Sequence, residues 1–241
     1  LPEPIKFHGF PDQVRTYYQN AGFLFDLQLA IEEFFAKIYY LGPLREYPKR
    51  QYTWTGAQPN DMGKRGEKCI DALLSSREQG IKISRGFRKK KYTVEEYVAF
   101  WLKELGLIHS FSISEIAEGT SIYQVKVKRN KESSSVLLTD VGFGVSQILP
   151  VLALCYYVPE GSTLLIEQPE IHLHPKVQAG LADVFIDSME KKGIQIILES
   201  HSEHLLRRLQ RRIAEEKISN EKLKIFFCTN NGNQSELADL D

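Results

Sequence analysis

The sequence predicts an α/β fold in which a mostly parallel sheet is flanked by helices. After Asp140, apolar runs of strand length alternate with stretches of helical periodicity, and the strand-like runs read "STLLIE", "IQIILES" and "KLKIFFCT". Apolar runs joined by helices are typical of a parallel sheet that is covered on both faces. Before Asp140 the spacing is mixed, which predicts a helical and β region that precedes the sheet. We therefore expect two parts, residues 1–115 and residues 116–241.

Composition limits the classes of function. The chain has 241 residues, of which 42% are hydrophobic, so it can bury a full core. Lys plus Arg and Asp plus Glu number 31 each, which gives no overall attraction to nucleic acid or membrane. The three cysteines are far apart and predict neither disulfides nor a thiolate zinc site, so we expect a cytoplasmic protein. No apolar run approaches the roughly 18 residues of a membrane span, and we expect no membrane partner.

In the first half, a helical spacing of apolar residues predicts a helix from Phe23 to Tyr40, which Gly42 and Pro43 stop. A polar, aromatic stretch at 45–60 predicts an ordered loop. "GEKCIDALLSS" predicts a short amphipathic helix, and "TVEEYVAFWLKELG" predicts another with a capping box. "FSISEI" and "SIYQVKVKR" alternate apolar and polar residues, as half-buried strands do.

In the second half, "VSQILPVLALCYYV" predicts a helix that begins close to Ser146, because Pro150 is tolerated only near a first turn. The next helix has Pro175 at its first position and Gly193 past its end. "EHLLRRLQRRIAEE" predicts a third helix, which comes before the last strand-like run.

Two predicted strands end in carboxylates, Glu167 and Glu199. Ligands of open α/β sheets lie at the carboxyl ends of the strands, so we expect both side chains in one crevice. A carboxylate at a fixed strand tip can hold Mg²⁺, directly or through its waters. The sequence therefore predicts Glu167 as a magnesium ligand.

Glycines and a histidine flank this strand end along the chain. Gly142 and Gly144 come just before a predicted helix, where glycines let the backbone approach an anion and the helix N-terminus offers unpaired N–H groups. His201 follows the next strand, where an imidazole could hydrogen-bond a terminal phosphate or an attacking water. The order of these features predicts a phosphate site.

The motifs "YLGPLR", "DVGFGVSQ" and "EQPEIHLHP" resemble the C-terminal half of ABC-type ATPases of the structural-maintenance-of-chromosomes and overcoming-lysogenization-defect branch, and the closest likeness is to bacterial AAA-family ATPases. The resemblance implies the C-terminal lobe of a P-loop NTPase fold. It extends from Tyr40 to about Phe227 and is strong from Leu138 to Leu206.

The resemblance also implies roles for single residues. Glu167 would be the Walker B acid that holds Mg²⁺, 170–174 the D-loop region, and His201 the switch histidine. The signature that closes on the γ-phosphate of ATP would be Gly142, Phe143, Gly144, Val145, Ser146 and Gln147. ATP and Mg²⁺ would be the cofactors, and a homodimer would hold the nucleotide in its interface. Relatives act in DNA repair or phage defence, which implies DNA or a partner nuclease.

The chain departs from this family in two places. The phosphate-cradling motif G-x-x-x-x-G-K-[ST] is absent, and its nearest approach, Gly63-Lys64-Arg65, has no hydroxyl after the lysine. We therefore expect that the sequence is a piece of a longer ATPase, that the missing lobe precedes Leu1 and that the piece alone is inactive. Gln168 stands where the family has its general base. An amide cannot take a proton from water, so Gln168 would orient the water, or Glu170 would act as the base.

Two other functions stay open at this point. Glu170, His172, His174 and His201 could centre a metal-dependent hydrolase or nuclease, although an H-x-H turn that ends in Pro is expected to shape a loop instead. The chain could also be an interaction module that senses nucleotide without hydrolysing it, a reading that the missing P-loop favours.

Basic residues are grouped at three places. For the first group we expect a solvated loop more than contacts with nucleic acid, and the second group could instead be paired with acidic residues near it. For the third, ion pairing and phosphate sensing stay open. The groups are Arg85, Arg88, Lys89, Lys90 and Lys91, flanked by Phe87 and Tyr92; Arg207, Arg208, Arg211 and Arg212, which Glu215 and Glu216 could pair; and Arg45 with Arg50.

Overall fold

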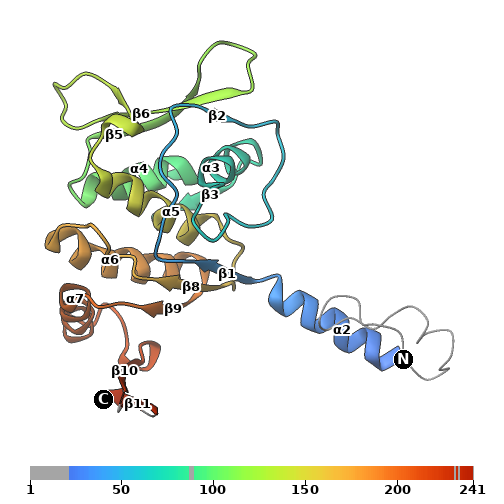
Figure 1. The fold of residues 1–241 in the computed structure, drawn as a ribbon, viewed down its shortest axis with the longest axis vertical. Coiled ribbons are helices and arrows are strands. Elements are labelled where there is room, and N and C mark those ends of the chain that lie inside the picture. Colours follow the sequence, from blue (N-terminus) through green and yellow to red (C-terminus); the bar gives the residue numbers. More distant parts are fainter. Residues whose placement is uncertain (1–21, 87–89, 231, 233, 241) are drawn as a thin grey trace.

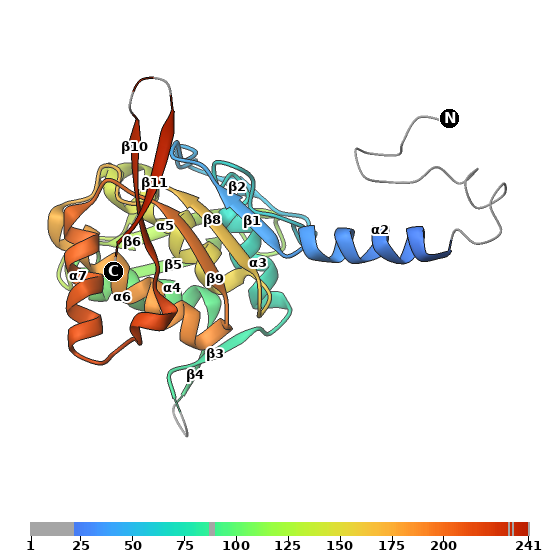
Figure 2. The same ribbon diagram turned by 90° about the horizontal axis from the view of Figure 1, so that it is seen from below.

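The structure, a computed structural model, describes residues 22–86, 90–230, 232 and 234–240 (Figures 1 and 2). Its α-helices are α2 (Gly22–Phe35), α3 (Cys69–Glu78), α4 (Val94–Glu104), α5 (Phe143–Tyr157), α6 (Pro175–Lys192) and α7 (Glu203–Ala214). Its strands are β1 (Ile38–Leu41), β2 (Tyr52–Thr53), β3 (Lys82–Ser84), β4 (Lys91–Thr93), β5 (Ser110–Glu115), β6 (Ile122–Lys128), β7 (Val136–Leu137), β8 (Thr163–Glu167), β9 (Gln195–Glu199), β10 (Ile225–Asn230) and β11 (Ser235–Leu240). None of the helices in these ranges is long and apolar enough to cross a membrane.

The predicted α/β class, with a parallel sheet flanked by helices, is confirmed. The sheet has the order β1-β8-β9, and both pairings are parallel. On one face Leu164 and Ile166 are buried, and Figure 1 shows α5 and α6 on this side of the sheet. On the other face Tyr40 and Ile197 are 39% and 54% exposed. The expectation that both faces are covered is therefore wrong for the described residues.

The N-terminal helix and the last strand differ from the sequence prediction. The helix ends at Phe35, and Ile38 already lies in β1, which pairs in parallel with β8. The residues "KIYY" fit both the helical and the strand spacing of apolar residues. They form a strand because β8 supplies a ladder of backbone hydrogen bonds. The predicted last strand, β10, forms an antiparallel hairpin with β11 and does not join the parallel sheet.

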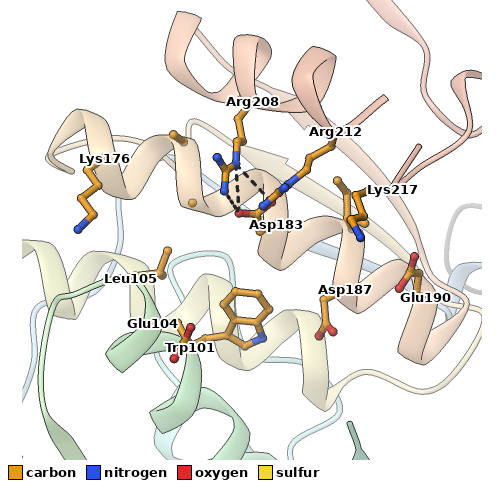
Figure 3. A pocket seen from close by; sticks show the side chains of 13 residues that line it. Trp101, Glu104, Leu105, Lys176, Asp183, Asp187, Glu190, Arg208, Arg212 and Lys217 are labelled. Carbon is orange, nitrogen blue, oxygen red and sulfur yellow. Dashed lines mark hydrogen bonds and ion pairs between the residues drawn. The ribbon is translucent and has the colours of Figure 1, made fainter. Parts of the chain in front are cut away.

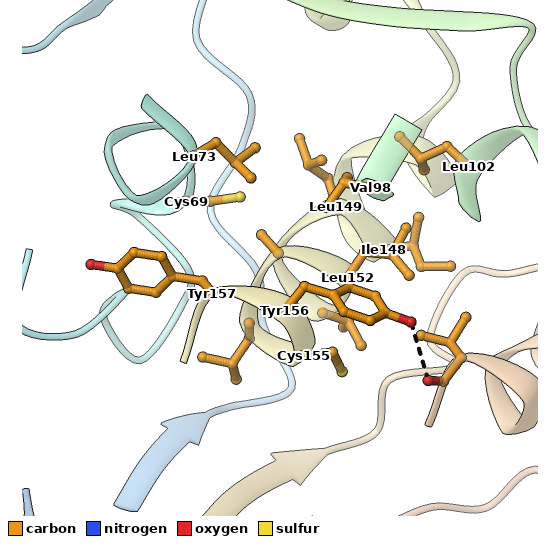
Figure 4. Close-up of a cluster of buried hydrophobic side chains, with 14 of the residues drawn as sticks. Cys69, Leu73, Val98, Leu102, Ile148, Leu149, Leu152, Cys155, Tyr156 and Tyr157 are labelled. Atoms are coloured by element: carbon orange, nitrogen blue, oxygen red, sulfur yellow. Dashed lines mark hydrogen bonds between the residues drawn. The ribbon is translucent and has the colours of Figure 1, made fainter. Parts of the chain in front are cut away.

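Helix α5 begins earlier than predicted, at Phe143, and Pro150 lies inside it. Proline lacks the N–H that would bond to the carbonyl of Ser146, which costs stability in a helix interior. The helix is nevertheless apolar on all sides, and it packs at the centre of the core (Figure 4). We infer that this burial outweighs the lost hydrogen bond.

The region between β1 and α5 along the chain forms a second layer against α5, so it does not precede the whole sheet as predicted. Helices α3 and α4 pack on α5, as Figure 1 shows. Strands β5 and β6, which lie on either side of residue 115, pair antiparallel over the whole length of β5, and β2 and β7 pair with β6. The strands predicted from "FSISEI" and "SIYQVKVKR" are thus confirmed.

The predicted capping box at the start of α4 is confirmed. Thr93 Oγ1 accepts a hydrogen bond from Glu96 N at 3.1 Å, and Glu96 Oε2 accepts one from Thr93 N at 2.8 Å. Thr93→Ala should lower the free energy of unfolding by about 1 kcal/mol, the usual effect of losing an N-cap side chain. Urea denaturation measures this change. The exposed Thr229→Ala in β10 is the control, with an expected change within about 0.5 kcal/mol, and equal effects at both positions would contradict the capping role.

Candidate functional site

The two strand-end carboxylates lie side by side, as the sequence predicts. Glu167 pairs in register with Glu199 across β8 and β9. Side chains in register on neighbouring parallel strands point to the same face, here the one that carries Tyr40. Tyr40 donates a hydrogen bond from its hydroxyl to Glu167 Oε1 at 2.9 Å, and this bond raises the pKa of the phenol. The tip of β8 therefore carries a carboxylate that Tyr40 contacts through one oxygen.

Gln168 lies in a backbone conformation that is uncommon for a residue with a side chain. Its φ is 44°, and that of His172 in the same turn is 61°. Gln168 N donates to Glu199 O at 2.9 Å, and Gln168 Nε2 donates to Glu199 Oε1 at 3.2 Å. Left-handed conformations at non-glycine residues store strain and cluster at functional sites. The turn after β8 is therefore a candidate for a functional role.

Glu170 and Arg45 are buried beneath the strand tips, with exposed fractions of 7% and 4%. Glu170 Oε1 accepts a hydrogen bond from His201 N at 2.7 Å, and Arg45 Nη2 donates to Glu167 O at 3.0 Å. Within the described ranges, Glu170 Oε2 and Arg45 Nε and Nη1 have no partner. Burial lowers the pKa of Arg45 to about 10, against the attraction of Tyr40, Glu167 and Glu170. The guanidinium thus stays charged and supports the site from below.

His201 lies in the turn between β9 and α7. Its Nε2 is 3.4 Å from Glu199 Oε1, and its side chain is 78% exposed. The neighbouring Ser202 fixes the turn, because its hydroxyl caps α7 by accepting from Leu205 N and donates to Gln178 Oε1 of α6 at 2.7 Å. The imidazole therefore reaches solvent beside the strand tips, from a turn whose backbone is held by hydrogen bonds.

The predicted signature, residues 142–147, starts α5 and contacts the turn after β8. The ring of Phe143 lies 5.0 Å from that of His172. A Cβ atom at Gly142 would meet no described atom within 4 Å, so the fold itself leaves space there. Ser146 Oγ donates to Phe143 O at 2.7 Å, and Val145 and Gln147 are buried. The structure thus places the signature next to the predicted D-loop region, residues 170–174.

The two histidines of "HLHP" have structural contacts. His174 is the N-cap of α6, and its Nδ1 accepts a hydrogen bond from Lys176 N at 3.3 Å. His172 packs on Phe143. The part of the chain that the structure describes contains no group of three or more His, Cys, Asp or Glu side chains placed to hold a metal ion. These contacts agree with a loop-shaping role for both histidines.

The turn at Gly63 does not have the form of a phosphate loop. A Cβ atom at Gly63, whose φ is 78°, would lie 1.9 Å from Glu67 Oε2. The same oxygen accepts a hydrogen bond from Arg65 N at 3.1 Å. The Glu67 carboxylate therefore already accepts the hydrogen bond of Arg65 N, a backbone donor that a phosphate loop would offer to an anion.

The basic helix α7 is bound to its neighbours by ion pairs. Arg208 and Arg212 contact Asp183 of α6 at 2.8 and 2.5 Å, and Arg211 contacts Glu215 at 2.6 Å. Figure 3 shows the Asp183 group at the wall of a cavity of about 620 Å³ between α4, α6 and α7, which none of the strand-tip residues lines. The predicted pairing with Glu215 is confirmed for Arg211 and Arg212, whereas the pairing of Arg208 and Arg212 with Asp183 was not predicted.

Arg50, Arg85 and Lys90 are exposed, unlike Arg45. Arg50 pairs with Asp140 at 3.3 Å. Arg85 stacks over the ring of Phe100 at 3.9 Å, and Lys90 Nζ lies 5.2 Å from the ring centre of Tyr92. Phe87, Arg88 and Lys89 lie outside the described residues.

Sequence reasoning gave no role to Tyr40 and left Arg45 undecided. Both belong to the "YLGPLR" stretch, 122 or more residues before Glu167 and Glu170. The sequence signal for both residues was a short apolar run followed by polar residues, which is typical of a strand end. The prediction of a helix up to Tyr40 hid this signal. The sequence also predicted Glu199 at a strand end but assigned it no role in catalysis or binding.

Comparisons with known proteins identify a family and several distant structures. Residues 18–207 match the profile of a family described as "AAA domain, putative AbiEii toxin, Type IV TA system". No curated protein matches the chain.

The solved structures include one from work on ATP-driven dimerization and DNA-stimulated activation of SMC ATPases (14% identity, 61% of this chain and 83% of that chain, TM-score 0.47). Another is the Smc head domain with an extended coiled coil bound to the C-terminal domain of ScpA, from Pyrococcus furiosus (11% identity, 61% of this chain and 34% of that chain, TM-score 0.46). Both likenesses are too distant to assign a reaction or a partner to this chain.

Proposed function

Because this chain belongs to the AAA-domain family whose description names the AbiEii toxin, we propose that it is the part of an ABC-type ATPase that holds Mg²⁺ and completes the nucleotide site. The observation that carries the proposal is the group at the strand tips. Glu167 and Glu199 lie in register on neighbouring strands, with Gln168 in a left-handed conformation between them and His201 at 3.4 Å from Glu199.

The residues at the tips suit Mg²⁺ and a nucleotide phosphate. Carboxylate oxygens are hard ligands, and Mg²⁺ in ATPases is held by one or two of them together with phosphate and water. Glu167 would hold the ion, which when bound neutralises the negative charge of the reacting phosphates. Arg45 supports this position, because its Nη2 donates to the carbonyl of Glu167 from below.

The remaining residues position the reactants. Gln168 orients the attacking water through its amide, and His201, which reaches solvent, hydrogen-bonds the terminal phosphate. The N-terminus of α5, with open space at Gly142, offers backbone N–H groups to the γ-phosphate of a nucleotide held by a second subunit. The contact between Phe143 and His172 supports a shared face for signature and D-loop.

We further propose a homodimer that holds ATP in its interface and acts in bacterial defence or a DNA-related process, with DNA or a nuclease as partner. The family description, which names a toxin of a type IV toxin–antitoxin system, supports the defence role. Because the charge of the chain is balanced, any contact with nucleic acid would have to come from a local patch.

The proposal is tested by phosphate release from ATP in the protein at its full native length. Turnover should require Mg²⁺, and it should rise faster than linearly with protein concentration while the dimer forms. Absence of Mg²⁺-dependent turnover above background at millimolar ATP would contradict the proposed reaction. In that case ATP binding without turnover would favour the nucleotide-sensing module, a function that the amide at Gln168 also suits.

Residues 1–241 alone should bind ATP weakly. The sequence contains no G-x-x-x-x-G-K-[ST] motif, and Glu67 fills the turn at Gly63, so the backbone donors that cradle the phosphates are missing. Isothermal titration with Mg-ATP should give no Kd below about 0.1 mM, which corresponds to roughly 5.5 kcal/mol. A low-micromolar Kd that survives Glu167→Gln would mean that these residues bind the nucleotide elsewhere.

A further inference from the structure

Glu199 is an accessible acidic group beside the proposed magnesium site. It ends β9, lies in register with Glu167 and therefore points to the same face of the sheet. Its side chain is 50% exposed, whereas Glu170 as a whole residue is 7% exposed. Water can therefore reach the carboxylate of Glu199 directly.

Two polar side chains hold this carboxylate in place. Gln168 Nε2 donates to Glu199 Oε1 at 3.2 Å, and His201 Nε2 lies 3.4 Å from the same oxygen. Both neighbours approach Oε1, which leaves Oε2 for another contact. A half-exposed carboxylate with one oxygen held by neighbours has the arrangement that a general base requires.

Glu170 is less suited to that task. Its Oε1 already accepts a hydrogen bond from His201 N at 2.7 Å, and its Oε2 lies in the interior near the charge of Arg45. A carboxylate that is buried has little access to the water that a general base must reach. Its contacts fit a residue that fixes the turn of His201.

We propose that Glu199 is the general base of the ATPase, in the place of the carboxylate that Gln168 lacks. This inference rests on the proposed function. Glu199 takes a proton from the water, whose oxygen forms a bond to the γ-phosphorus. The bond between that phosphorus and the β,γ-bridging oxygen breaks, and ADP leaves with the electron pair. Glu199 then gives its proton to solvent. Gln168 orients the carboxylate and the water, and His201 contacts the carboxylate through Nε2.

The test uses the protein at full native length and compares Glu199→Gln with Gln168→Glu/Glu199→Gln. The single variant should lose 10²–10⁴-fold in kcat, roughly the usual contribution of a general base. Its affinity for Mg-ATP should stay within about threefold, because no binding group is removed. The double variant should recover most of the turnover, since it returns a carboxylate to the neighbouring position. A structural role for Glu199 would not give this recovery.

The control is Glu203→Gln, an exposed carboxylate in the first turn of α7 that pairs with Arg207. Its turnover should stay within about twofold of the unmodified protein. If the unmodified protein hydrolyses ATP and Glu199→Gln retains more than a fifth of that rate, Glu199 is not the base, although the proposed function stands. A double variant as inactive as the single one would also overturn the assignment. If the unmodified protein shows no Mg²⁺-dependent hydrolysis, the proposed function fails and the base with it.

Discussion

Glu167→Gln in the protein at full native length is expected to abolish ATP turnover. The amide has nearly the shape of the carboxylate and can still accept the hydrogen bond from Tyr40, so the fold should persist. The negative charge that holds Mg²⁺ is lost, however, and with it several kcal/mol of transition-state stabilisation, or about 10³-fold in rate. Steady-state phosphate release at saturating ATP measures this loss.

Glu160→Gln is the matched control, because Glu160 is an exposed carboxylate just before the opposite end of β8. Its turnover should stay within about twofold of the unmodified protein. A Glu167→Gln variant with the unmodified rate would show that the tip of β8 is not the magnesium site. Thermal unfolding of both variants separates a catalytic loss from a folding defect.

Leu152→Ala is expected to cause the largest loss of stability, about 2–5 kcal/mol in the free energy of unfolding. Leu152 is fully buried at the centre of α5, in the cluster that this helix forms with side chains of α3 and α4 (Figure 4). Removing its side chain loses burial energy and leaves a cavity that the rigid surroundings fill only in part. Denaturant titration measures the change.

Leu44→Ala makes the same chemical change at a residue that is 71% exposed. There the expected effect is within about 0.5 kcal/mol, as for most surface substitutions. Similar losses at both positions would mean that α5 is not the centre of a single cooperative core.

The elements that follow from local signals were predicted well. The capping box of Thr93 and Glu96 and the pair of Pro175 and Gly193 mark helix ends through contacts within a few residues. β1 was missed because its four residues, read alone, continue the helical spacing of α2. Only the pairing with β8, more than 120 residues later in the chain, makes them a strand.

In the candidate site, too, the residues that follow from local signals were predicted and those that depend on distant pairing were missed. The acids Glu167 and Glu199 were predicted at strand ends because parallel strands end at a common edge. The positions of Tyr40 and Arg45 beside them depend on β1, so the misassigned helix hid both contacts. The hydrogen bond from Gln168 to Glu199 depends on a left-handed residue, which no local pattern in a glutamine predicts.

The most direct test is a structure of the protein at full native length with Mg²⁺ and a non-hydrolysable ATP analogue. We expect a carboxylate oxygen of Glu167 at about 2.1 Å from Mg²⁺, or hydrogen-bonded to one of its waters. The analogue's γ-phosphate should lie beside His201 and the tip of β9. A metal ion held elsewhere, with Glu167 bonded only to Tyr40, would contradict the proposal that the tip of β8 is the magnesium site of an ATPase.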